Sequence, residues 1–172
     1  MPVAVEDIPD TGLHIELDAP AEARVDVAKL AAVRDLPRLS AVFDLTRRGA
    51  GVHVAGQVRA RVGQTCVITL EPIENDVEET VDLLFAPLPA DGAQPKAEIE
   101  GAGPKRGEEP PEPLLGGIVD LGAIATEFLI LGIDPYPRKA GAQFSPPKAD
   151  NDGARHFAAL EELKKRLGGG QS

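Results

Sequence analysis

Arginine residues in one alternating segment have the type and spacing best suited to binding chemistry in this sequence. Arg59 and Arg61 lie two positions apart, so both side chains should lie on the polar face of one strand. Guanidinium groups gathered on one face can bind RNA phosphates or the acidic surface of a protein. We therefore predict a patch that contacts RNA or a protein partner. Its members are Arg47, Arg48, Arg59 and Arg61, and Arg34 and Arg38 could extend it.

Acidic residues that follow these arginines indicate a different binding function. Asp76, Glu78 and Glu79 lie in the next segment, where they could receive a basic protein. The formal net charge of −10 favours this alternative over bulk attraction to nucleic acid. A third interpretation is a solvated strand face, on which Glu71, Glu74 and Glu79 balance the arginines. The sequence leaves these three alternatives open.

Catalysis and metal binding have little support in the sequence. His14, His53 and His156 are far apart, and no serine or pair of carboxylates has a recognisable catalytic setting. The single cysteine, Cys66, cannot form an internal disulfide, and with three scattered histidines it does not supply a four-ligand zinc site. We therefore predict a non-enzymatic protein without cofactor or metal. Cys66 is expected to pack as a small buried hydrophobic residue inside the sheet.

The candidate residues lie on segments with the two-residue period of β-strands. Consecutive strands joined by short turns favour antiparallel pairing, so these segments should form one sheet. The predicted strands lie near residues 13–17, 38–47, 51–63, 64–71 and 78–87. The acidic stretch from Glu71 to Asp76 is predicted to be the bend of a hairpin.

Two helices are predicted to accompany the sheet. The first covers about residues 21–34, with Asp18 or Ala19 as its cap. The second follows Asp120, a good N-cap, and ends at the two prolines of residues 134–137. It is apolar on most of its circumference, so it should pack against the sheet or in a partner's groove. The predicted fold class is α+β, mainly an antiparallel β-sheet, either open or barrel-like, with two or three helices.

The length of 172 residues predicts a single domain, residues 1–172. Residues 89–117 are rich in proline, glycine and charge, which predicts a flexible acidic insertion. Residues 138–153 are predicted to be a flexible linker, and residues 154–167 a C-terminal helix that either docks on the core or binds a partner. Because the sequence has no leader-like start and no long apolar run, we expect a cytoplasmic protein.

Several spaced motifs resemble one protein family. The run from Gly56 to Ile73, GQVRARVGQTCVITLEPI, resembles the signature of the YceD family, the large ribosomal RNA subunit accumulation proteins. Residues 81–87, VDLLFAP, are similar to the family's next strand, and residues 119–137 are similar to its helix and proline-flanked exit. The likeness spans about Leu39 to Ala142 and is interrupted by the acidic insertion.

The resemblance also shows where this chain departs from the family. Many members have a second cysteine three positions after the first and another pair near the proline exit, a spacing that implies metal binding. Thr69 and residues 135–138 occupy those positions here, so one thiol remains.

The resemblance implies a role in accumulation of large-subunit ribosomal RNA, and so in ribosome biogenesis. Its expected partners are ribosomal RNA or a large-subunit ribosomal protein, and neither a membrane nor a small-molecule substrate is expected. In the direct version the arginine patch contacts RNA. In the indirect version the acidic residues hold a basic ribosomal protein.

Overall fold

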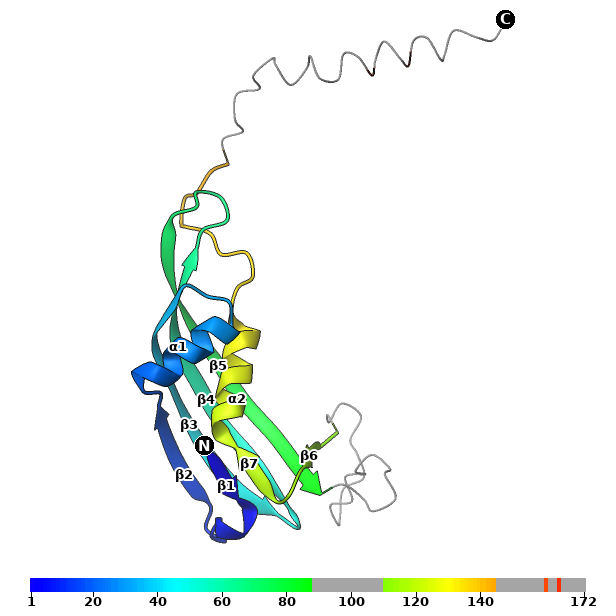
Figure 1. The fold of residues 1–172 in the computed structure, drawn as a ribbon. Helices are drawn as coiled ribbons and strands as arrows, with labels where there is room; N and C mark the ends of the chain where they lie inside the picture. Colours follow the sequence, from blue (N-terminus) through cyan, green and yellow to red (C-terminus); the bar gives the residue numbers. More distant parts are fainter. Residues whose placement is uncertain (88–109, 145–159, 161–163, 165–172) are drawn as a thin grey trace, which may run out of the picture. The chain divides into compact units, whose positions relative to one another are not determined.

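The computed structural model describes residues 1–87, 110–144, 160 and 164 (Figure 1). The chain divides into two units, Met1–Ala140 and Gly141–Ser172. The helices and strands described below all belong to the first unit. In the second unit the structure describes Gly141–Phe144, Leu160 and Lys164 only.

Five strands form a mixed sheet in the order β2-β3-β4-β5-β6. Their bounds are β2 (Leu13–Asp18), β3 (Asp35–Arg48), β4 (Gly51–Thr65), β5 (Pro72–Pro87) and β6 (Glu112–Leu114). The first four pair antiparallel, whereas β6 pairs parallel with β5. The parallel pairing is sterically accessible because the connection from Pro87 to Glu112 is long enough for a crossover. The α+β prediction is confirmed, and the described sheet is open, with β2 and β6 at its edges, rather than a closed barrel.

Both helices cover one face of this sheet. Helix α1 (Ala21–Leu30) packs on β3, and helix α2 (Leu121–Gly132) packs on β5 and β4, as Figure 1 shows. The apolar positions of the strands point toward the helices, and their alternate positions point to the opposite face. Completely buried members of this core include Phe43, Val54, Val58, Val62 and Leu129. No helix within the described ranges is long and apolar enough to cross a membrane.

Close packing between β3 and β4 depends on Gly56, which lies opposite Phe43. A Cβ atom at this position would collide with the carbonyl oxygen of Val42 and the ring of Phe43. Phe43 is fully buried, so its ring has little room to give way. Glycine at this position therefore lets the largest core side chain lie directly against the β4 backbone.

The predicted strand at residues 64–71 is wrong. Gln64 and Thr65 end β4, and the chain then turns through Cys66–Leu70, where Leu70 has the left-handed φ of 59°. The amide of Leu70 donates to the carbonyl of Cys66 at 2.9 Å, which closes the turn. Apolar alternation over residues 66–70 therefore does not reflect a strand, because local hydrogen bonds satisfy the backbone instead.

The predicted acidic bend is also wrong, because most of its residues belong to a strand. Pro72 begins β5, and Glu74, Asn75 and Asp76 are paired strand residues of β5. The tip of the hairpin thus lies about five residues earlier in the chain than its turn-forming composition indicates. This shift decides which residues of β4 and β5 face each other.

Helix α1 ends earlier than expected, at Leu30 rather than near residue 34. Ala32 takes a left-handed φ of 53°, and the amide of Val33 donates to the carbonyl of Ala28 at 3.1 Å. These features terminate the helix without proline. At the other end Pro20 is the N-cap residue and no side chain caps the helix, so neither Asp18 nor Ala19 has the predicted role.

Four short elements were not predicted from the sequence. Strand β1 (Pro2–Ala4) pairs antiparallel with β7 (Ile118–Asp120), and a short 3₁₀ helix, η1 (Val5–Asp7), follows β1. Strand β6 lies within the range 89–117 that was predicted to be a flexible insertion, so the last part of that range is paired with the sheet. The rest of the predicted insertion, up to residue 109, lies outside the described residues.

The predictions for the C-terminal region fall largely outside the described residues. In the predicted linker, residues 138–144 are described and contain no helix or strand. In the predicted C-terminal helix only Leu160 and Lys164 are described, and both are helical.

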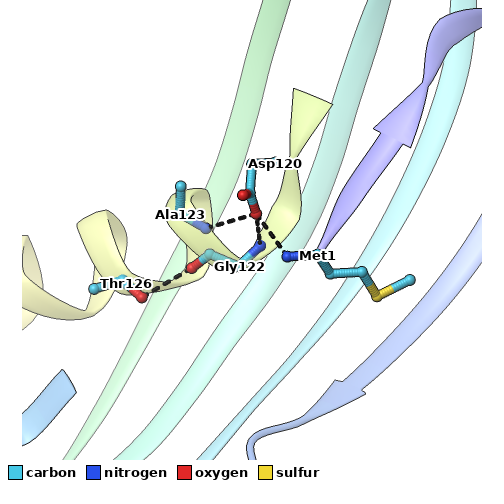
Figure 2. Close-up of polar contacts among 5 residues, drawn as sticks. All are labelled: Met1, Asp120, Gly122, Ala123 and Thr126. Carbon is cyan, nitrogen blue, oxygen red and sulfur yellow. Dashed lines mark hydrogen bonds and ion pairs between the residues drawn. The ribbon is translucent and has the colours of Figure 1, made fainter. Parts of the chain in front are cut away.

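Asp120 anchors the start of α2, as predicted. Its Oδ1 atom accepts hydrogen bonds from the amides of Gly122 at 2.9 Å and Ala123 at 3.2 Å (Figure 2). The same oxygen lies 2.7 Å from the amino group of Met1, which ties β1 to the helix. The amino group and the capping amides lower the pKa of Asp120 below its ordinary value of 3.8. One carboxylate thus joins the cap of α2 to the β1–β7 pair.

Replacing Asp120 with alanine should lower the free energy of unfolding by about 1 kcal/mol at neutral pH, the usual cost of losing an N-cap. Because the folded state lowers the pKa of Asp120, its contribution is present above the unfolded value and is lost as the pH falls through the folded value. The difference from the unsubstituted protein should therefore shrink below pH ~4. Urea denaturation at pH 7 and pH 3 measures this difference. The exposed Thr80→Ala variant is the control, and a pH-independent deficit for Asp120→Ala would contradict the assignment.

Candidate interaction surface

The face of the sheet opposite the helices, called the open face, carries most of the charged side chains of β2–β5. Arg59 and Glu78 are direct cross-strand partners, and so are Arg61 and Asp76. Arg59 Nη2 lies 3.1 Å from Glu78 Oε1, and Arg61 binds both oxygens of Asp76 at 2.9 and 3.1 Å. The two predicted site groups therefore meet as alternating ion pairs on one surface.

The pair between Arg61 and Asp76 is bidentate, so its geometry is more restricted than that of the pair between Arg59 and Glu78. Its hydrogen bonds raise the pKa of Arg61 and lower the pKa of Asp76 below its ordinary value of 3.8. Both side chains are more than half exposed, so water and salt screen the pair. The pair consequently fixes the direction of the two side chains more than it stabilises the fold.

Arg38 extends the arginine group, as predicted, because it lies directly opposite Arg61 on β3. Arg34 does not extend it in the same way. It precedes β3, its amide donates to the carbonyl of Gly63, and its side chain lies 3.8 Å from Asp35. The guanidinium group of Arg34 thus lies beside a carboxylate at the end of the sheet.

Arg47 and Arg48 are not brought together with Arg59 and Arg61. Arg47 donates to the carbonyl oxygens of Val5 at 3.1 Å and Glu6 at 2.6 Å, so it holds η1 against the end of β3. Arg48 lies at the β3–β4 turn, opposite Gly51. With a rise of about 3.3 Å per residue, this turn lies roughly 30 Å along β4 from Arg59 and Arg61.

Glu79 does not share a face with Asp76 and Glu78. Consecutive residues of a strand point to opposite faces, and Glu79 lies on the helix side of β5. A Cβ atom at Gly132 would lie 2.5 Å from Glu79 Oε1, so this carboxylate lies against the C-terminal end of α2. Of the three predicted acids, only Asp76 and Glu78 belong to the open face.

Two histidine–aspartate pairs also lie on the open face. His14 Nδ1 lies 2.7 Å from Asp44 Oδ1 across β2 and β3, and His53 Nε2 lies 2.6 Å from Asp82 Oδ1 across β4 and β5. The hydrogen bond to Asp44 raises the pKa of His14 above its ordinary value of 6.5. The sequence does not reveal these pairs, because each histidine lies about 30 residues from its aspartate. The alternation of each histidine with apolar neighbours does indicate that its side chain lies on the polar face of a strand.

The open face carries more negative than positive charge. Its eight carboxylates are Glu16, Asp18, Asp35, Asp44, Glu74, Asp76, Glu78 and Asp82, and its four guanidinium groups are Arg38, Arg48, Arg59 and Arg61. The acids on β2 and β3 were not among the predicted site residues. Their two-residue period was visible in the sequence, but only the pairing of β2 with β3 and of β3 with β4 shows that they share a face with Arg59 and Arg61.

Cys66 lies at the tip of the β4–β5 hairpin, where it is fully buried. Its sulfur accepts hydrogen bonds from the amides of Lys139 at 3.3 Å and Thr69 at 3.4 Å. These donors lower the pKa of Cys66 to about 6, because they favour the thiolate over the thiol. The prediction of burial is confirmed, but the residue lies in the turn rather than inside the sheet.

The turn at Cys66 also holds the segment that follows α2. The amide of Val67 donates to the carbonyl of Pro137 at 2.9 Å, and Gln64 Nε2 donates to the carbonyl of Asp134 at 2.8 Å. Lys139 Nζ lies 2.9 Å from Glu71 Oε2 and lowers the pKa of that carboxyl group. Gln64 and Lys139 were not among the predicted site residues, because the two partners of each bond lie far apart in the chain.

The surroundings of Cys66 do not fit a zinc site. The groups next to its sulfur are backbone amides, which donate hydrogen bonds and cannot ligate a metal. Across the described residues, no group of three or more histidine, cysteine, aspartate or glutamate side chains is arranged to hold a metal ion.

A protein-family model described as "Large ribosomal RNA subunit accumulation protein YceD" matches residues 54–164. This match covers more than half of the chain and includes most of β4, all of β5 and all of α2. The chain belongs to the YceD family. The family's description connects it with accumulation of the large-subunit ribosomal RNA. Comparisons with curated proteins and with solved structures give no match.

The YceD match places the family signature on the most extensively paired part of the sheet. Residues 54–87 form the β4–β5 hairpin, which carries the ion pairs on its open face and the Cys66 turn at its tip. Strands β2 and β3, which supply Glu16, Asp18 and Asp44, lie before the matched region. The open face therefore combines a family segment with strands that the family model does not cover.

Replacing Cys66 with alanine should destabilise the protein more at pH 8 than at pH 5. The folded state lowers the pKa of the thiol, so its contribution is present above the unfolded value and is lost as the pH falls through about 6. Urea denaturation at the two pH values measures the change. Val67→Ala, at an exposed position of the same turn, is the control. An equal deficit at both pH values would show that the sulfur acts only through packing.

Proposed function

We propose that this YceD-family chain supports accumulation of large-subunit ribosomal RNA without catalysis, by binding a basic large-subunit ribosomal protein on its open face. In this proposal the effect on RNA is indirect. The observation that carries it is the pairing of Arg59 and Arg61 with Glu78 and Asp76, on a face where carboxylates outnumber guanidinium groups.

The pairing disfavours RNA as the direct ligand of the two central arginines. A phosphate would have to displace the carboxylates that already bind these guanidinium groups, and it would approach a surface with excess negative charge. A lysine or arginine of a protein partner would instead be attracted by the excess negative charge of this surface. Glu16, Asp18 and Asp44 on the neighbouring strands offer further acceptors to it.

The absence of catalysis is part of the proposal. The two histidine–aspartate pairs have a geometry that can orient a general base. However, their described hydrogen bonds lead to carboxylates, and no nucleophilic side chain hydrogen-bonds to either ring in the described structure. In this proposal the two pairs contribute polar and charged groups to the open face.

Isosteric neutral variants of the ion pairs test this proposal, because replacing the acids and replacing the arginines should change the binding of basic protein in opposite directions. Asp76→Asn together with Glu78→Gln removes the proposed acceptors and should weaken binding of basic large-subunit protein by about tenfold. Arg59→Gln together with Arg61→Gln frees the same carboxylates and should maintain or strengthen it. The probe is total protein extracted from large ribosomal subunits, measured by retention on immobilised chain with and without nuclease. Circular dichroism checks that each variant is folded.

Titration with purified large-subunit ribosomal RNA provides the competing outcome. If the chain binds this RNA with a steep dependence on salt, and Arg59→Gln with Arg61→Gln abolishes the binding, direct RNA contact replaces the proposal. The proposal is supported if basic protein is retained after nuclease treatment and only the variant Asp76→Asn with Glu78→Gln loses this retention. Equal retention by both variants would place the partner on another surface.

A further inference from the structure

An apolar groove lies on the helical side of the molecule, across the sheet from the open face. It has a volume of about 610 Å³ and lies between the C-terminal end of α1 and the side of α2 that faces away from the sheet. Leu30, Ile130 and Leu131 form its apolar walls, and the small residues Gly122 and Ala123 line the first turn of α2 within it. Figure 2 shows these two residues beside Asp120 and Thr126.

The apolar walls of the groove are exposed although their type is typical of a protein interior. Leu30 and Leu131 are 69% and 71% exposed. Helix α2 uses Leu121 and Leu129, both fully buried, to pack on the sheet, so its apolar residues on the other side have no cover within the described chain. A helix that is apolar on both sides is typical of one that is covered on both sides.

The polar groups of the groove define the charge of the ligand that would fit. The hydroxyl of Thr126 already donates to the carbonyl of Gly122 at 2.8 Å, and Asp120 is occupied by the Met1 amine and the cap. Lys29 beside the groove is paired with Asp26 at 3.0 Å. Glu127 is exposed and makes no ion pair within the described part of the chain. The available polar group is therefore an anion, which favours a cationic group on the occupant.

The floor and walls together suit a helix rather than an extended segment or a small molecule. The small, exposed Ala123 allows a backbone to approach the first turn of α2, and Leu30 and Leu131 can contact aliphatic residues one turn apart on it. We propose that this groove binds an amphipathic helical segment of a partner protein, with aliphatic side chains toward Leu30 and Leu131 and a lysine or arginine toward Glu127. This docking site is separate from the open face and does not depend on the function proposed for it.

Synthetic peptides test the groove without involving ribosomal components. The probe is a fluorescent amphipathic peptide of about 15 residues, with leucines at helical spacing and lysines beside them. Its partner peptide has glutamate at every lysine position. The unsubstituted chain should bind the lysine peptide more tightly, and Leu131→Asp should weaken that binding by about tenfold. Glu127→Lys should reverse the preference between the two peptides, which a merely unfolded variant could not do.

Val25→Asp is the matched control, because Val25 is 55% exposed on α1 but does not line the groove. It should leave binding of both peptides unchanged. Equal affinity of the unsubstituted chain for the two peptides, or no effect of Leu131→Asp, would overturn the proposal. Sedimentation of the chain alone provides another decisive outcome. Self-association that Leu131→Asp removes and the lysine peptide displaces would make a second copy the occupant and refute the assignment to a partner protein.

Discussion

The register of β4 between β3 and β5 is the constraint on which the described structure depends. Val58, Ala60 and Val62 are buried against the helices, while Arg59 and Arg61 between them lie on the open face. A slip of one residue would exchange the two sets and place both guanidinium groups in the apolar core. Gly56 reinforces the register, since the absence of a side chain at this position allows the β4 backbone to lie against the ring of Phe43.

The same register determines the chemistry of the surface. Because Arg59 lies opposite Glu78 and Arg61 opposite Asp76, the arginines that look like RNA contacts in the sequence are occupied by carboxylates in the fold. Their ion pairs are exposed and weak, so they remain exchangeable with a charged partner. The excess of acids around them is the reason why a cationic partner is proposed. The charge pattern of this face follows from strand pairing, which no inspection of single residues could supply.

Much of the fold could be predicted because its strands have strong local patterns. The segments at residues 13–17, 38–47 and 51–63 coincide with β2, β3 and β4, and Asp120 caps α2 as its residue type indicates. The pairings of the candidate site could not be predicted, since they depend on the position of the β4–β5 turn. A bend at Glu71–Asp76 would have given Arg59 a partner about ten residues further along the chain. Likewise, the role of Arg47 depends on carbonyl groups of Val5 and Glu6, about 40 residues away.

The Cys66 turn shows why the local pattern misled at this point. Its apolar residues alternate, but its amides and its sulfur are engaged by a turn and by the segment after α2 rather than by a neighbouring strand. The two regions where the family resemblance implies further cysteines, at Thr69 and near residues 135–138, lie together in the structure. Here the amides of Thr69 and Lys139 converge on the one remaining sulfur, and the Lys139–Glu71 ion pair lies beside them. Hydrogen bonds to the buried sulfur of Cys66 thus hold the segment after α2 on the hairpin that carries the open face. These bonds strengthen when the thiol ionises.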